Sequence, residues 1–213
     1  MTHHSEQRDL PLIQQAIIPI AAFAAAGDQR KLAHALEQGL DAGMSVSTAK
    51  EVLVQLYAYA GFPRSINALA TLMALLPKRA ERGIQDLEGP APSHPAPLGD
   101  DLLARGSATQ TRLVGQPVSG PLFEFAPAID TFLKTHLFGD IFERDNLDWQ
   151  SREVATVAML SAIAGAESQL RSHLLMSINT GLNHQQLQQL VQILTEQVGG
   201  DTALRARTVL AGL

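Results

Sequence analysis

The chain has no cysteine and no run of lysine or arginine in its 213 residues. Without cysteine it can form no disulfide, thiolate metal site or thiol redox pair. Its formal net charge is −5, and a chain of this charge without a basic run presents no electrostatic footprint for nucleic acid or an anionic membrane. We therefore expect neither nucleic acid nor a membrane as a partner.

Long apolar runs are also missing. None reaches the roughly 18 residues that a transmembrane helix requires. The run at residues 16–26, AIIPIAAFAAA, superficially suits a signal-peptide core, but Asp9 cancels the charge of Arg8 ahead of it, and the run aligns with the internal segment 154–164. With 46% hydrophobic residues, we expect a globular, cytoplasmic protein.

An internal repeat is the most informative feature that is present. Shifted by 138 residues, the segment 12–75 lies on 150–213 without a gap. Glycines that would end helices coincide, and so do leucines and alanines that would face a core. The pattern predicts a tandem duplication, with these glycine pairs in register: Gly27 with Gly165, Gly43 with Gly181, and Gly61 with Gly199.

Each copy reads as a series of helices, and no segment alternates apolar and polar residues long enough to indicate a sheet. The fold class that we expect is all-α, with the two copies packed as one pseudo-symmetric unit. The expected helices are 11–26, 29–42, 47–60 and 63–76, the last stopped by Pro77, then 149–164, 167–180, 183–198 and a final one from 201 to 211.

Between the copies lies a proline-rich stretch. Residues 89–98, GPAPSHPAPL, hold four prolines in ten residues and are typical of an extended linker. We expect a first domain at 1–77, a linker and connecting segment at 78–120 with only a short helix and loop after residue 100, and a second domain at 121–213 that begins with an additional helix over 127–138.

Glu153 and His173 are the residues that could carry chemistry. They lie on opposite sides of the Gly165 turn, and at about 1.5 Å per residue their axial distances from the turn are roughly 18 and 12 Å. The two side chains can therefore bridge an antiparallel hairpin. A carboxylate beside an imidazole in an apolar setting suits general acid–base catalysis, although such a pair is often purely structural.

Several motifs together resemble those of the carboxymuconolactone decarboxylase family. The turn at residues 57–63, YAYAGFP, resembles the motif that ends this family's domain. The other motifs all lie in the second copy: 138–140 (FGD), Arg144, 147–153 (LDWQSRE), Gly165, 170–173 (LRSH) and 180–183 (TGLN).

The resemblance implies the all-α fold of the alkylhydroperoxidase-D-like superfamily, which forms trimers or hexamers. It places the family's glutamate on Glu153 and its histidine on His173. It also implies either a cofactor-free decarboxylase of aromatic catabolism or a thiol peroxidase. The peroxidase cysteines would fall near Ala166 and Gln169, so that activity is excluded here.

The first copy departs from this pattern. Gln15 and Ala35 stand where Glu153 and His173 are expected, and His34 is one position away, or about 100° of helix rotation. The duplication thus predicts one site per chain, in the second copy, with the turn at residues 59–63 as a wall from the first copy.

The remaining candidates surround that pair. Arg152 could hold a substrate carboxylate, although it and Arg171 fit exposed salt bridges better. Tyr59 and Trp149 could line the substrate, or could simply pack. We expect no cofactor and no metal, since no other histidine, including His136 and His184, has a ligand-like partner three or four residues on.

Two functions stay open. One is a cofactor-free lyase that acts on a small cyclic or unsaturated carboxylic acid, with His173 as proton donor or acceptor and Glu153 orienting it. The other is a non-catalytic, oligomeric small-molecule-binding protein of the same fold. In either case we expect a homo-oligomer, for example a trimer of duplicated chains, because both copies place apolar residues on more than one helix face.

Overall fold

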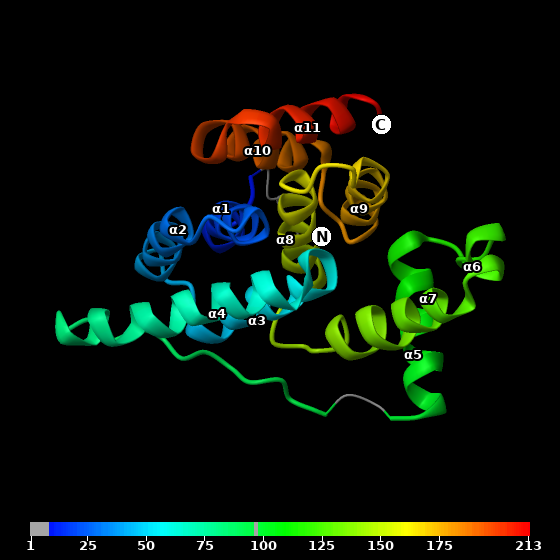
Figure 1. The fold of residues 1–213 in the computed structure, drawn as a ribbon, viewed down its shortest axis with the longest axis horizontal. Helices are drawn as coiled ribbons and strands as arrows, with labels where there is room; N and C mark the ends of the chain where they lie inside the picture. Colours follow the sequence, from blue (N-terminus) through cyan, green and yellow to red (C-terminus); the bar gives the residue numbers. More distant parts are fainter. Residues whose placement is uncertain (1–8, 96–97) are drawn as a thin grey trace, which may run out of the picture.

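The computed structural model describes residues 9–95 and 98–213, and within them every regular element is a helix. Figure 1 shows their arrangement. The first half contains α1 (Leu12–Ala26), α2 (Gln29–Asp41), α3 (Val46–Gln55) and α4 (Tyr57–Glu81). The second half contains α5 (Asp100–Val114), α6 (Pro121–Phe125), α7 (Pro127–Phe132), the π-helix η1 (Leu133–Ile141), α8 (Trp149–Ser161), α9 (Glu167–Asn179), α10 (His184–Ile193), the π-helix η2 (Leu194–Val198) and α11 (Gly200–Ala211). The expected all-α class is confirmed.

Helices α1 and α8 pack against each other at the centre of the molecule (Figure 1). Both are buried over most of their length, α1 from Ile17 to Ala25 and α8 from Ser151 to Ser161. Helix α1 is apolar nearly all round, and such a helix must be covered on every side. Helix α8 buries polar side chains as well, including Arg152 and Glu153. Each of the two is covered by the next helix in sequence, α2 or α9, and by helices of the other half.

Side-chain caps fix where several helices begin. Asp148 accepts a hydrogen bond from the backbone N–H of Ser151, and this cap starts α8 as the sequence predicted. Asn183 and Gln186 form a capping box at the start of α10. Because the cap of α8 sets the rotation of the helix, it also sets the direction in which Glu153, five residues later, points.

The glycines 138 residues apart share their backbone conformation. The φ angles are 79° at Gly27 and 84° at Gly165, 93° at Gly43 and 101° at Gly181, and 82° at Gly61 and 74° at Gly199. Positive φ is the conformation that glycine adopts at least cost, so each pair meets the same backbone requirement. The chain therefore turns in the same way at three corresponding points of its two halves.

Helix α4 is interrupted at Gly61, whose φ of 82° and ψ of 161° are not helical, so the break expected between residues 60 and 63 is present. Other expected boundaries are wrong, and the helix expected at 47–60 already ends at Gln55, the end of α3. Helix α4 does not stop at Pro77 but continues to Glu81, because Arg79 in its last turn is buried and held by Asp86 and Asp41. The proline removes one backbone donor, a smaller loss than that of a buried ion pair. The segment after residue 100 is not a short helix either, since α5 runs for 15 residues to Gly115, which has a φ of 87°.

Helices α5 and η1 cross at two glycines. A Cβ atom on Gly106 would lie 1.7 Å from the carbonyl oxygen of Lys134, and one on Gly139 would lie 2.7 Å from Leu102 Cδ1. The backbones are thus close enough to exclude any side chain at the crossing. This contact makes the region expected as a short helix and loop part of a helical pair that supports the start of the second half.

The segment between α4 and α5 is extended, as the prolines predicted, and runs along the lower edge of Figure 1. It is attached to the start of α3, where the backbone N–H groups of Val46 and Ser47 donate to the carbonyls of Leu87 and Glu88 at 2.8 Å. Further on, Ser93 donates its backbone N–H to Asp145. Residues 96 and 97 of the linker lie outside the described part.

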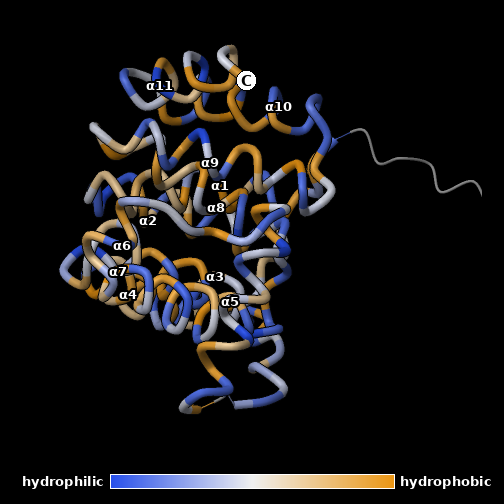
Figure 2. The backbone as a smooth tube through the Cα atoms, turned by 90° about the vertical axis from the view of Figure 1, so that its right-hand side faces the viewer, coloured by the Kyte–Doolittle hydropathy of each residue, from blue (hydrophilic) through white to orange (hydrophobic). Residues whose placement is uncertain are grey.

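Hydrophobic and hydrophilic residues alternate in short stretches along most helices, as expected for helices with one buried face (Figure 2). None of the helices within residues 9–95 and 98–213 has both the length and the apolar character needed to cross a membrane.

Candidate active site

The expected contact between Glu153 and His173 is present. The Nδ1 atom of His173 on α9 lies 2.8 Å from Oε2 of Glu153 on α8. Ionised Glu153 can only accept, so Nδ1 carries the proton in this pair and Nε2 is the free ring nitrogen. The hairpin that the Gly165 turn closes therefore assembles one carboxylate and one oriented imidazole.

The pair is almost sealed within the chain. Glu153 is 0% exposed and His173 is 6% exposed. The second carboxylate oxygen of Glu153, Oε1, is buried without a hydrogen-bond partner among the described residues. A buried carboxylate oxygen left without a donor costs free energy, and a catalytic or ligand-binding role is one explanation for such a group.

Tyr59 from the first half completes this cluster. Its ring meets the ring of His173 edge-on, with centroids 5.5 Å apart and an interplanar angle of 82°. Its hydroxyl is buried near the side chain of Thr156 and forms no hydrogen bond of normal geometry within the described chain. Burial raises the pKa of Tyr59 well above its ordinary value, and the negative charge of Glu153 raises this pKa further. Tyr59 thus stays a neutral phenol beside the Glu153–His173 pair.

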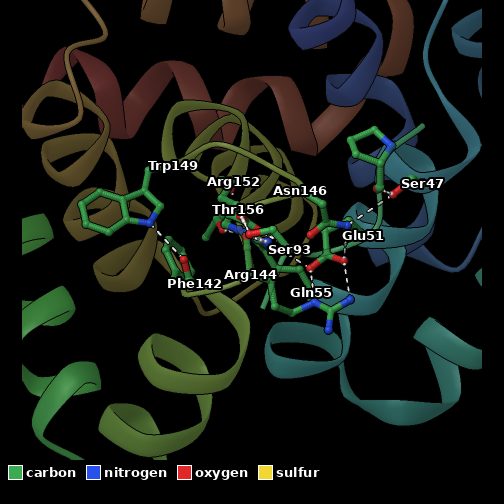
Figure 3. A network of polar contacts seen from close by, with 12 residues as sticks. Ser47, Glu51, Gln55, Ser93, Phe142, Arg144, Asn146, Trp149, Arg152 and Thr156 are labelled. Atoms are coloured by element: carbon green, nitrogen blue, oxygen red, sulfur yellow. Dashed lines mark hydrogen bonds and ion pairs between the residues drawn. The ribbon is translucent and has the colours of Figure 1, made fainter. Parts of the chain in front are cut away.

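Arg152 lies on α8 next to Glu153 but belongs to a different cluster, drawn in Figure 3. Its guanidinium donates to Glu51 Oε1 at 2.9 Å, to Gln55 Oε1 at 3.0 Å and to the carbonyl of Arg144 at 2.7 Å. Gln55 in turn donates to Thr156 Oγ1 at 2.7 Å. The expectation of an exposed salt bridge is wrong, because Arg152 is 0% exposed.

Glu51 is the centre of that cluster. Besides Arg152, it accepts from Arg144 at 2.7 and 3.0 Å and from Asn146 at 3.1 Å. Burial alone would raise the pKa of Glu51, but the hydrogen bonds from Arg144 and the charge of Arg152 outweigh it and lower this pKa below its ordinary value. The carboxylate therefore stays charged and ties α3 to α8.

Sequence reasoning missed Glu51 and Gln55. Their signal was available: two polar residues four apart, which share one face of a helix and stand among Val52, Leu53, Val54 and Leu56. The predicted role of Arg152 in binding a substrate stays a prediction. Its three hydrogen-bond partners are all protein groups, and its Nε atom is buried without a hydrogen-bond partner within the described residues.

Trp149 also lies apart from the Glu153–His173 pair. Its Nε1 donates to the carbonyl of Phe142 at 3.0 Å, and its ring lies 4.8 Å from the Arg112 guanidinium (Figure 3 shows the first contact). It lines a hollow of about 330 Å³ with Arg112 and Asn179. The structure therefore brings together Glu153, His173 and Tyr59. Arg152 lies beside them in its own polar cluster, close enough for its charge to act on Tyr59, and Trp149 lies elsewhere.

The expectation that no other histidine has a ligand-like partner three or four residues on is wrong for one of them. His136 does have a partner four residues on, because its Nδ1 lies 2.6 Å from Asp140 Oδ2. One imidazole and one carboxylate make only two ligands. Within residues 9–95 and 98–213 no group of three or more such side chains has the arrangement of a metal site.

The second half of the chain also matches a known protein family. Residues 127–212 match the carboxymuconolactone decarboxylase family. The match runs from the start of α7 to the end of α11 and includes Glu153 and His173. It supports the resemblance for this half of the chain, and no curated protein matches the chain.

Proposed function

We propose that the chain is a cofactor-free lyase in which Glu153 and His173 act on a small cyclic or unsaturated carboxylic acid. The observation that carries this proposal is the 2.8 Å contact between Glu153 Oε2 and His173 Nδ1, which leaves Nε2 to meet a substrate. The family match over residues 127–212 supports a decarboxylase-like or alkylhydroperoxidase-D-like activity. With no cysteine in the chain, the thiol route of the latter is unavailable.

The chemistry that the pair can perform is proton transfer. When the bond between a ring carbon and its carboxylate breaks, carbon dioxide leaves and the electron pair stays in the conjugated system. Protonated His173 then donates its Nε2 proton to that carbon, and Glu153 holds the ring and balances its charge. Solvent returns the proton to Nε2. Such positioning of a proton contributes roughly 10² to 10⁴ in rate.

Access to Nε2 is restricted because His173 is only 6% exposed and Tyr59 lies against its ring. In this proposal a substrate reaches Nε2 when Tyr59 swings away. The buried Tyr59 hydroxyl and the unpartnered Glu153 Oε1 then have a polar group to bind. The same burial favours the second candidate, a non-catalytic binding protein in which the pair is structural.

We also propose that the two halves are a tandem duplication and that the protein works as a cytoplasmic oligomer. The shared glycine conformations and the 138-residue register support the duplication. The contact of Tyr59 with His173 supports a contribution of the first copy to a site in the second.

The test is an activity screen with unsaturated and lactone carboxylic acids that measures carbon dioxide release, for the wild type, His173→Ala and Tyr59→Phe. A lyase should lose most activity in His173→Ala with circular dichroism unchanged. If His173→Ala keeps full activity on a substrate that the wild type converts, or only lowers the melting temperature, the non-catalytic function replaces this proposal.

A further inference from the structure

The largest of the described hollows is not at Glu153 and His173. It is a cavity of about 780 Å³ between α1, α2 and η2, with walls that include Gln15 on α1, Ala35 on α2 and Gln197 on η2. Moved by 138 residues, Gln15 corresponds to Glu153, Ala35 to His173, and Tyr59 to Gln197. The cavity is therefore the counterpart, in the first half, of the sealed cluster in the second.

The differences between these residues explain why one position is hollow and the other is filled. Ala35 ends at Cβ, whereas His173 at the corresponding point fills the space toward α8 with an imidazole. Gln197 is exposed to solvent, whereas Tyr59 lies against the ring of His173. Loss of two rings leaves a volume well inside the range of small-molecule sites, about 300–1,000 Å³.

The charge of the cavity has one sign. Arg30, Lys31 and His34 contribute to its wall, and no carboxylate is among the residues that line it in the described chain. Arg30 and His34 form no ion pair with any described residue. Lys31 lies 3.7 Å from Asp28, but this pair is half-exposed and weak. The cations at the mouth are thus free to meet an anion.

The inner part of the cavity is apolar. Pro19 and Phe23 on α1 are buried and belong to its wall, together with Ala35. The Lys31 ammonium lies 5.4 Å from the centre of the Phe23 ring, so a cation stands next to an aromatic surface. An apolar interior with basic groups at its mouth selects a ligand that has an apolar body and one anionic end.

We propose that this cavity is a second, non-catalytic binding site for a small organic anion of the aromatic or cyclic carboxylate class. Gln15 and Ala35 offer neither a charge nor a titrating proton, so the site binds without chemistry. The carboxylate of the ligand meets Arg30 and Lys31, and its ring enters between Phe23 and Ala35. This inference does not depend on whether Glu153 and His173 catalyse a reaction.

The experiment uses benzoate as the anionic probe and benzyl alcohol as an uncharged probe with the same ring. Each is titrated into the full-length protein by calorimetry, and binding is located by amide NMR shifts of Ala35 and Gly39. We expect saturable benzoate binding that shifts these amides, and binding of benzyl alcohol at least tenfold weaker. No saturable binding of benzoate, or equal binding of both probes, would overturn the proposal.

One double variant removes the charges at the cavity without touching the core. Arg30→Gln with Lys31→Gln should weaken benzoate at least fivefold, because both residues are exposed and their loss leaves the carboxylate unpaired. The matched control, Lys78→Gln with Arg105→Gln, changes the net charge equally at exposed positions outside the cavity. Equal weakening in both double variants would mean that only the overall charge matters, and would also overturn the site.

A third pair of variants separates this site from the proposed active site. Ala35→Trp should fill the cavity and abolish benzoate binding, whereas His173→Ala should leave binding at Ala35 unchanged. If His173→Ala abolishes the Gly39 shift while Ala35→Trp keeps it, benzoate binds at the second half and the present inference fails. Activity in the carbon dioxide assay is scored independently of these shifts.

Discussion

Arg152 on α8 is held by Glu51 on α3, 101 residues earlier in the chain, through a contact of 2.9 Å between Nη2 and Oε1. Both side chains are buried, and Arg144 and Gln55 share the cluster (Figure 3). An arginine buried in this way cannot lose its charge, so the free-energy cost of burying that charge is offset only if a carboxylate lies beside it. This polar tie between α3 and α8 therefore depends on Glu51.

Glu51→Gln should destabilise the protein by about 3–5 kcal/mol at pH 7, because it leaves Arg152 buried without a counter-charge. Urea unfolding followed by circular dichroism measures this change. The control is Glu88→Gln, which removes an exposed ion pair with Lys50 and should change the free energy of unfolding little. Equal effects of the two substitutions would contradict the role assigned to Glu51.

The lowered pKa of Glu51 predicts that the free energy of unfolding depends on pH. The pKa of Glu51 is lowered in the folded state from an ordinary value of 4.5, so its contribution to stability is complete above about pH 4.5 and is lost as the pH falls through the lower folded pKa. The free energy of unfolding of the wild type should therefore fall more steeply below pH 4.5 than that of Glu51→Gln. Parallel curves in this window would show that Glu51 is not the titrating group.

Gly106→Ala should separate α5 from η1, because the new Cβ atom would lie 1.7 Å from the Lys134 carbonyl oxygen. We expect a loss of about 1–3 kcal/mol from overpacking, and faster hydrogen exchange over residues 100–141. Gly212→Ala is the matched control, since its Cβ would meet only ordinary contacts at 3.6 Å or more. Unchanged exchange over residues 100–141 in Gly106→Ala would mean that the helices do not cross closely.

Glu153→Gln and His173→Ala should not be additive in kinetics. If the two residues act as one unit, each single substitution removes most of the rate, and the double substitution is scarcely worse than the worse single one. The measurement is kcat/KM on the acid found in the screen, with Gln192→Ala, an exposed substitution on α10, as the control. Fully additive losses would indicate two independent roles.

Oligomerisation is expected from the apolar surface that the single chain leaves open. Met73 on α4 is 70% exposed and Phe125 on α6 is 89% exposed, and Phe62, Ile66 and Leu122 on the same helices are also exposed. Light scattering should give a multiple of 22.9 kDa, and Met73→Asp or Phe125→Asp should lower it. A stable monomer at micromolar concentration would contradict this expectation.

The sequence by itself determined the helical class, most helix starts and the Glu153–His173 contact. These follow from local rules: Asp148 and Asn183 cap helices through their own neighbours, and Gly165 closes a hairpin whose length sets which side chains can meet. Hydrophobic spacing three and four residues apart marked the buried faces of α10.

Only the tertiary structure decided where α4 ends, because Arg79 finds Asp41 and Asp86 through packing that no local pattern shows. It also decided that Arg152 is buried rather than exposed, since its partner Glu51 comes from a helix 101 residues away. The cavity at Ala35 is also a feature that only the tertiary structure decided. A void is defined by the side chains around it, and these come from α1, α2 and η2 only when the chain is folded.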